Sequence, residues 1–191
     1  MNEILKPKTI VLGVTGSIAA YKSADLASRL AKADYELYVI MTENAKQFIG
    51  SVTFQTLSKH PVMSNVFDEK DSWRPGHIEL ADNADLLLIA PATANTIAKL
   101  AHGIADDPLG EVALATLAPM LVAPAMNGKM WMHPATQCNV ETLKSRGVQF
   151  IGPEEGMLAC GYTGVGRMWN VEGVVERVEE ILGPKQNRSG C

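Results

Sequence analysis

The feature that most constrains the fold is a regular alternation of short apolar runs with amphipathic stretches. Five runs are apolar nearly throughout, as in strands covered on both faces, and they occupy 9–15, 36–42, 84–93, 119–126 and 148–153. Stretches with apolar residues at helical spacing follow them at 17–32, from 43, 94–104, 109–117, 134–147 and 171–182. This alternation predicts an α/β fold, a doubly wound parallel sheet with helices on both faces.

Length, charge and cysteine usage narrow the class of protein. The chain has 191 residues and a formal net charge of −4, and 47% of its residues are hydrophobic. We expect a single domain over 1–182 and a disordered tail at 183–191. The weakly acidic balance argues against nucleic acid as a partner, and the apolar runs are too short to span a membrane, so a cytoplasmic protein is expected. The three cysteines form no C-x-x-C pair, so neither a disulfide framework nor a metal site is indicated.

Ligands of doubly wound folds bind at the carboxyl ends of the strands, so the segments that follow the strands are the candidates for a site. These segments read GSIAA, TENA, PATAN and PAMNGKMW, together with a glycine-studded loop at 152–168. If the sheet is parallel, they should converge in space.

The stretch GVTGSIAA joins the first strand to the first helix. We expect Gly16 to adopt a positive φ and Ser17 to cap the helix, which leaves backbone N–H groups for a phosphate. A tight turn with an ordinary helix cap has the same pattern. The stretch is not G-x-G-x-x-G, so it supports a dinucleotide only weakly.

Polar side chains at two other strand ends have more than one interpretation. Thr93, Asn95 and Thr96 can bind a cofactor, or they can cap the helix that follows. Asn127 offers an amide donor suited to a carboxylate or a ring carbonyl.

His77 and Cys160 are the candidates for proton transfer. A lone histidine is more often structural or exposed than catalytic, and a free cysteine is usually a small hydrophobic residue. A thiol in a glycine-rich loop over a crevice instead suggests a proton donor or a nucleophile. The residues alone leave both interpretations open.

Three segments in this order resemble the family of homo-oligomeric flavin-containing cysteine decarboxylases. PAMNGKMW matches the family's P-x-M-N-x-x-M-W signature, GHIELA resembles its active-histidine segment, and LACGYTGVGRM resembles its substrate-lid segment. The resemblance covers about 9–182 and implies a Rossmann-like flavoprotein that binds FMN.

The resemblance also implies roles for individual residues. His77 would be the base beside the flavin, Asn127 would hold the substrate carboxylate, and Cys160 would be the proton donor in the lid. The implied substrate contacts are Met126, Asn127, Ala159 and Gly161. The implied FMN contacts are Gly16, Ser17, Ile18, Thr42, Thr93, Ala94, Asn95, Thr96 and Ala125.

Within the family, the resemblance is to members that act in coenzyme A biosynthesis. It implies FMN-dependent decarboxylation of 4'-phosphopantothenoylcysteine to 4'-phosphopantetheine. Oxidation to a thioaldehyde would create the electron sink that lets CO2 leave, and re-reduction would complete the product. The alternative is an oxidative decarboxylase of C-terminal peptidyl-cysteine in ribosomal peptide maturation, which would share His77 and Asn127 without needing Cys160.

The implied assembly is a homo-oligomer, either a trimer or a trimer-based dodecamer, with sites between subunits. In many bacteria the domain is fused to a synthetase, so this chain is expected to be either free-standing, with a separate phosphopantothenate–cysteine ligase, or a fragment. Other enzyme and regulatory classes fit less well. None of the four tyrosines starts a Y-x-x-x-K motif, as a short-chain NAD dehydrogenase requires. A prenyl-transferring flavin protein would need a basic prenyl-phosphate site, and the phosphatase-regulating relatives carry long acidic extensions.

Overall fold

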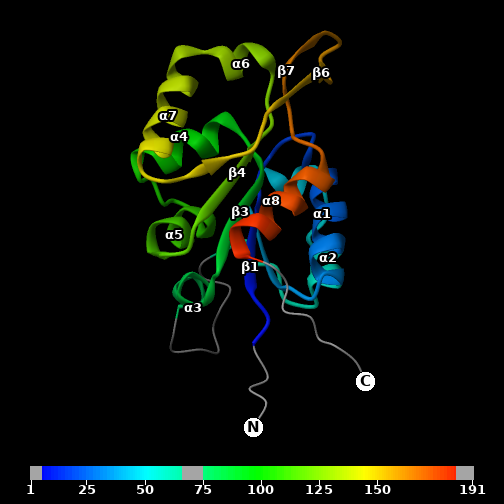
Figure 1. The fold of residues 1–191 in the computed structure, drawn as a ribbon, viewed down its shortest axis with the longest axis vertical. Coiled ribbons are helices and arrows are strands. Elements are labelled where there is room, and N and C mark those ends of the chain that lie inside the picture. Colours follow the sequence, from blue (N-terminus) through cyan, green and yellow to red (C-terminus); the bar gives the residue numbers. More distant parts are fainter. Residues whose placement is uncertain (1–5, 66–74, 184–191) are drawn as a thin grey trace.

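The central element of the fold is a five-stranded parallel sheet in the order β2–β1–β3–β4–β5 (Figure 1). The computed structural model describes residues 6–65 and 75–183. The strands are β1 (Thr9–Val14), β2 (Glu36–Met41), β3 (Leu86–Ala92), β4 (Met120–Pro124) and β5 (Gln149–Phe150). The predicted doubly wound parallel sheet is therefore confirmed. Apart from Gly183, the predicted tail lies outside the described residues.

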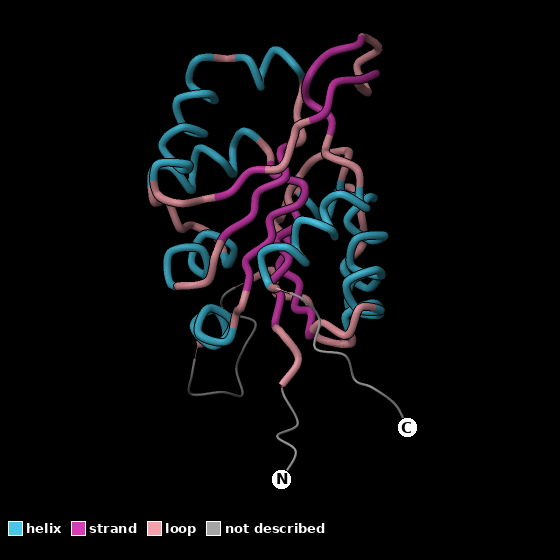
Figure 2. The backbone as a smooth tube through the Cα atoms, viewed as in Figure 1, coloured by secondary structure: helices cyan, strands magenta, loops and turns pink. Residues whose placement is uncertain are grey.

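Helices cover both faces of the sheet, as Figures 1 and 2 show. One face carries α1 (Ala20–Lys32), α2 (Ser51–Ser58) and α8 (Val171–Leu182). The other carries α3 (Gly76–Asn83), α4 (Ala94–His102), α5 (Pro108–Ala115) and α7 (Pro134–Ser145). Because successive side chains of a strand point to opposite faces, β1 supplies Ile10 and Leu12 to the first core and Val11 to the second. Every residue of β1 and β3 is buried, which explains why both strands are almost continuously apolar.

Two helices begin later than the apolar spacing predicts. The first begins at Ala20, not at 17, because the Ser17 hydroxyl accepts a hydrogen bond from the Ala19 N–H and holds a turn there. The helix predicted from 43 is a short 3₁₀ turn, η1 (Ala45–Gln47), and α2 follows only after an extended residue at Gly50.

The glycine-rich segment 152–168, expected as a loop, forms an antiparallel hairpin of β6 (Glu154–Met157) and β7 (Thr163–Arg167). Together with the short helix α6 (Gly128–Met132), the hairpin lies beyond the ends of the sheet strands (Figures 1 and 2). Helical and alternating patterns are both weak in a stretch with five glycines, which is why the sequence did not predict the strands.

No helix within the described ranges is long and apolar enough to cross a membrane.

Candidate active site

A pocket of about 870 Å³ opens at the carboxyl ends of the sheet strands. This volume is within the usual range for small-molecule sites. Four strands contribute the residues that follow them, around 16–19, 42–44, 93–96 and 125–127, and the hairpin adds 157–160 and 166–168. The segments predicted to converge therefore do so. From β1 the sheet extends to β2 on one side and to β3, β4 and β5 on the other, so the order of the strands reverses between β1 and β3. Folds of this kind bind their ligands at that point.

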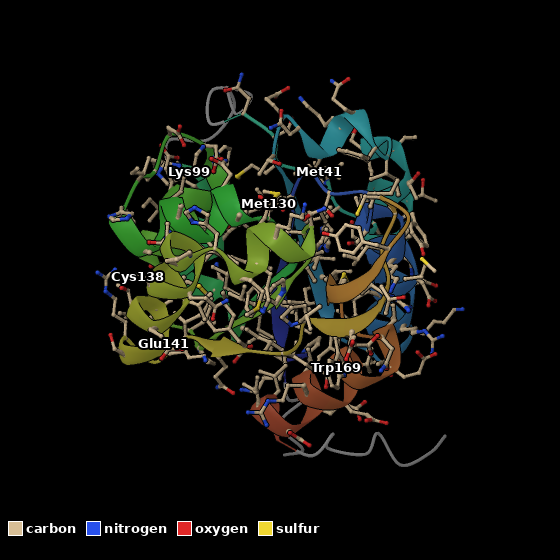
Figure 3. All side chains as sticks on the ribbon, turned by 90° about the horizontal axis from the view of Figure 1, so that it is seen from above. Met41, Lys99, Met130, Cys138, Glu141 and Trp169 are labelled. Carbon is tan, nitrogen blue, oxygen red and sulfur yellow. The ribbon has the colours of Figure 1, made fainter. Side chains whose placement is uncertain are left out.

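Figure 3 looks down on the pocket end of the molecule. Met130 of α6 and Lys99 of α4 both line the pocket, and Figure 3 labels them on this side. Cys138 lies on α7 toward the outer edge, and its thiol is free. Cys138 does not line the pocket, whereas Cys160 does.

One end of the pocket is the turn that leads from β1 into α1. A Cβ added at Gly16 would lie 2.5 Å from the Cβ of Asn44, so glycine is needed because two loops pack closely. Gly16 is not among the described glycines with positive φ, so the conformational reason predicted for it was wrong. No side chain caps the N-terminus of α1, so the prediction that Ser17 caps this helix was wrong, and Ser17 and Ile18 line the pocket just before it. The positive end of the helix dipole and backbone N–H groups therefore suit an anion such as a phosphate.

Thr93 joins the strand ends to α4. Its Oγ1 accepts from the Thr96 N–H at 3.2 Å, so the helix-cap interpretation holds for Thr93 while its side chain also lines the pocket. The Thr15 hydroxyl donates to the Pro91 carbonyl at 2.7 Å and accepts from the Thr93 N–H at 3.1 Å. These bonds tie the end of β1 to the end of β3 at the pocket floor. Asn95 lines the pocket and is exposed.

At the other end of the pocket lie two polar side chains, Asn127 and Cys160, and Tyr162, which does not line the pocket, contacts Asn127. Asn127 caps α6, and its Oδ1 accepts from the Lys129 N–H at 2.8 Å. The same oxygen accepts from the Tyr162 hydroxyl at 2.8 Å. The Asn127 Nδ2 donates to the Cys160 Sγ at 3.2 Å. The amide oxygen thus has two donors, and the amide NH2 is directed toward the thiol.

The hairpin rests directly on the loop after β4. The Met126 N–H donates to the Gly166 carbonyl at 2.9 Å, and a Cβ at Gly166 would overlap the Met126 carbonyl oxygen. A Cβ at Gly128 would lie 3.0 Å from the Val165 carbonyl oxygen. Gly166 and Gly128 therefore permit close backbone contact, whereas the sequence suggested only that glycines let the segment open and close. That movement stays a prediction.

Charged side chains complete the lining, and no sequence pattern identified them as site residues. Lys99 pairs with Asp106 at 2.6 Å and with Asp107 at 3.6 Å, and the hydrogen bond that Lys99 donates to Asp106 is the main reason that the pKa of Lys99 is raised. Burial, and then the nearby charge of Arg167, lowers the pKa of Lys22. Arg167 lies within the segment that resembles the family's substrate lid, and so does Tyr162, which contacts Asn127. Their place in that segment was the one sequence feature that could have identified them as site residues.

His77 is not in this pocket. All the predicted site residues are described, and His77, Ala94 and Gly161 are the three that do not line it. His77 lies on α3, where its Nδ1 is 3.4 Å from the Oε2 of Glu111 on α5. Figure 1 shows α3 and the β6–β7 hairpin at opposite ends of the molecule. One chain by itself therefore does not bring His77 to Asn127 and Cys160.

Comparison with known proteins finds close relatives over the whole described domain. The model of the family described as "Flavoprotein" matches residues 2–183. A probable phosphopantothenoylcysteine decarboxylase of Streptococcus mutans is 50% identical over 177 residues, which are 92% of this chain and 99% of that protein. The coenzyme A biosynthesis bifunctional protein CoaBC of Bacillus subtilis is 47% identical over 93% of this chain, but the chain spans only 44% of that protein.

Solved structures of cysteine decarboxylases have the same fold. A phosphopantothenoylcysteine (PPC) decarboxylase, with a cysteine replaced by serine and complexed with pantothenoylaminoethenethiol, has a TM-score of 0.83 at 30% identity, over 92% of this chain and 98% of that chain. The FMN-dependent cysteine decarboxylase SpaF has a TM-score of 0.80 at 32% identity, over 92% and 98% of the two chains. By its family match and by these relatives, the chain belongs to the flavoprotein family, in the branch that contains the phosphopantothenoylcysteine decarboxylases.

Proposed function

We propose that this protein is an FMN-dependent decarboxylase that converts 4'-phosphopantothenoylcysteine to 4'-phosphopantetheine in coenzyme A biosynthesis. The observation that carries the proposal is the hydrogen-bonded Asn127–Cys160 pair at one end of a pocket whose other end is the uncapped N-terminus of α1. The Streptococcus mutans relative, which this chain matches over 99% of its length, bears the name of this activity.

The pocket fits a flavin mononucleotide. The phosphate of FMN would bind at Gly16, Ser17 and Ile18, just before α1, which begins without a side-chain cap. Thr42, Thr93, Asn95, Thr96 and Ala125 line the space between this end and the Asn127–Cys160 pair and would hold the rest of the cofactor. When bound, FMN supplies the reversible oxidation of the carbon that carries the substrate thiol.

The chain's own groups bind the substrate and move a proton. Because both donors to the Asn127 Oδ1 come from the protein, the amide presents its NH2 group to the substrate carboxylate. The Cys160 thiol lies 3.2 Å from this NH2 group, so a carboxylate held by Asn127 would place the carbon that loses CO2 near the thiol, which could then deliver a proton to it. The hairpin lines this end of the pocket with residues 157–160, beside Asn127.

Two basic residues favour a phosphorylated substrate over a peptide. Lys22 and Arg167 both line the pocket, and Arg167 is close enough to Lys22 to lower its pKa, after the effect of burial. A bound phosphate would relieve the repulsion between these two positive charges. The alternative substrate, a peptide with a C-terminal cysteine, carries no such group.

We further infer that His77 reaches the site from a second copy of the chain, in a trimer or a trimer-based dodecamer. Two observations support this step. His77 is separated from the pocket of its own chain. Large apolar side chains are also exposed on and beside α3 and α5, the helices that hold His77 and Glu111, and these are Ile78, Ile104, Leu114 and Leu117. Burial of this patch between copies would place His77 near a neighbouring pocket.

The experiment that tests the proposal combines cofactor identification with turnover. The purified protein is expected to be yellow and to release FMN on denaturation. Incubation with 4'-phosphopantothenoylcysteine should yield a product lighter by one CO2, detected by mass spectrometry. Asn127→Asp is the matched control, because a carboxylate still accepts from Lys129 and Tyr162 but repels the substrate carboxylate.

The other outcomes point to specific errors in the proposal. A yellow protein that ignores this substrate but decarboxylates a peptide ending in cysteine would establish the alternative function. A colourless protein that cannot be reconstituted with FMN would rule out both. The cytoplasmic location and the separate ligase stay predictions.

A further inference from the structure

In the function proposed above Tyr162 contacts neither substrate nor cofactor, yet its hydroxyl makes one of the shortest contacts to Asn127. It donates to the Asn127 Oδ1 at 2.8 Å. The other donor to that oxygen, the Lys129 N–H, belongs to the helix that Asn127 itself caps. Tyr162 instead comes from the hairpin, at the turn that carries Cys160. Tyr162 therefore links the orientation of the Asn127 amide to the position of the hairpin.

The surroundings of Tyr162 make room for this contact. A Cβ at Gly164 would lie 3.2 Å from the Cε2 atom of the Tyr162 ring, and a Cβ at Gly128 would lie 3.7 Å from its hydroxyl oxygen. The backbone of Tyr162 is fixed as well, because its carbonyl accepts from the Leu158 N–H at 2.9 Å and closes the hairpin turn. The ring is thus held between the hairpin and the start of α6.

We propose that Tyr162 is a positioning residue, whose hydroxyl fixes the Asn127 carboxamide with its NH2 group toward the substrate carboxylate and the Cys160 thiol. This inference rests on the proposed function for its substrate. A carboxamide rotated by half a turn would place its NH2 against two donors and its oxygen against a carboxylate. With two donors on Oδ1 that rotation is disfavoured twice, and one of the two donors belongs to the hairpin.

The test is the Tyr162→Phe variant of the full, flavin-loaded protein. The variant keeps the ring and removes only the hydroxyl. The matched control is Tyr38→Phe, because Tyr38 stacks on His60 and does not line the main pocket. For Tyr162→Phe we expect the flavin content and melting temperature of the wild type, and a KM for 4'-phosphopantothenoylcysteine raised about 10-fold, the size of one neutral hydrogen bond. The control should have wild-type kinetics.

A second measurement tests the contact between Tyr162 and Asn127 without any turnover of substrate. In a background with Cys138→Ser and Cys191→Ser, the alkylation rate of Cys160 by iodoacetamide reports how firmly the hairpin turn is held. Tyr162→Phe should raise this rate several-fold, and Tyr38→Phe should leave it unchanged.

Unchanged KM and an unchanged alkylation rate in Tyr162→Phe would overturn the inference. Loss of flavin together with a lower melting temperature would overturn it too, because Tyr162 would then be a structural residue. Failure of the proposed function has a separate signature, since the wild-type protein would then not consume 4'-phosphopantothenoylcysteine. The alkylation rate would in that case decide the role of Tyr162 by itself.

Discussion

At the scale of single residues, the proposed chemistry depends on a pair that is distant in sequence. Asn127 and Cys160 are 33 positions apart and are joined by a hydrogen bond of 3.2 Å. In the proposed function the amide holds the substrate carboxylate beside a thiol that donates a proton, and the flavin supplies the oxidation. The roles of the two residues can be separated by substitution.

We expect Cys160→Ser to release CO2 but to stop at the oxidised enethiol, with formation of 4'-phosphopantetheine reduced about 100-fold or more, because a serine hydroxyl is a much weaker acid than a thiol. Mass spectrometry distinguishes the two products, and the absorption spectrum should show that the flavin remains reduced. Cys138→Ser, at the outer edge on α7, should behave as wild type. Normal product from Cys160→Ser would remove the thiol from the mechanism.

At the scale of elements, two contacts hold separate parts of the chain in register. The hairpin is joined to the loop after β4 through Gly166 and Met126. The start of β1 is joined to the start of β3 through Asp85, which accepts from the Thr9 N–H and from the Lys8 ammonium, both at 2.8 Å. The first contact shapes the pocket, and the second stabilises the sheet.

Gly166→Ala should displace the hairpin, because its Cβ would overlap the Met126 carbonyl oxygen. We expect a loss of about 1–3 kcal/mol in the free energy of unfolding and a lower kcat/KM, measured by denaturant titration and by turnover. Gly50→Ala is the control, since its φ of −70° suits alanine and the nearest atom would be 3.9 Å away. Equal effects from the two substitutions would show that the packing of the hairpin is loose.

Asp85 predicts a pH dependence of stability. Burial alone would raise the pKa of its carboxyl group, but the hydrogen bonds from Lys8 and Thr9 and the charge of Lys8 outweigh burial, so the pKa is lowered. A lowered pKa stabilises the folded state above the unfolded value of about 3.9, and this stability is lost as the pH falls through the folded value. Asp85→Asn should therefore lower the free energy of unfolding at neutral pH by about 0.5–1 kcal/mol, since the pair with Lys8 is partly exposed, and the difference from wild type should shrink below about pH 4.

Chemical denaturation of wild type and Asp85→Asn across this pH range checks the prediction. Asp34→Asn is a suitable control, because Asp34 is exposed and its φ of 59° is one that asparagine also tolerates. A difference between Asp85→Asn and wild type that does not change with pH would mean that the charge of Asp85 is unimportant.

At the scale of the whole molecule, the separation of His77 from the pocket makes assembly part of the proposed function. A site that takes Asn127 from one copy and His77 from another can be rebuilt from two inactive variants. We expect His77→Asn and Asn127→Asp to be inactive alone, and a co-expressed equal mixture to regain about a quarter of the wild-type activity, since each residue is intact in half of the copies.

Turnover by the unfractionated mixture measures this complementation, and purification through different tags on the two variants shows that hybrids form. Hybrids that form but have no activity would contradict a site shared between copies. Either variant retaining full activity alone would remove that residue from the site.

The sequence by itself determined the class of fold and most of the pocket. The alternation of strands and helices predicted the parallel sheet, because the burial of each face leaves a local periodicity in the chain. The segments after four strands were identified as site segments because parallel strands end on one edge of the sheet. The motifs around Asn127 and Cys160 predicted the family that the comparisons confirm.

Only the tertiary structure decided which residues meet and why the glycines are there. Nothing local to Asn127 indicates that Tyr162 and Cys160 contact it, since both arrive on a hairpin whose strands the glycines conceal. Gly16 is required by Asn44, a residue of another loop, and not by its own backbone angles. The distance of His77 from the pocket likewise follows from the path of the chain between α3 and β3. Periodicity records which side of an element is buried, whereas contacts between elements depend on register and crossover, which no local pattern contains.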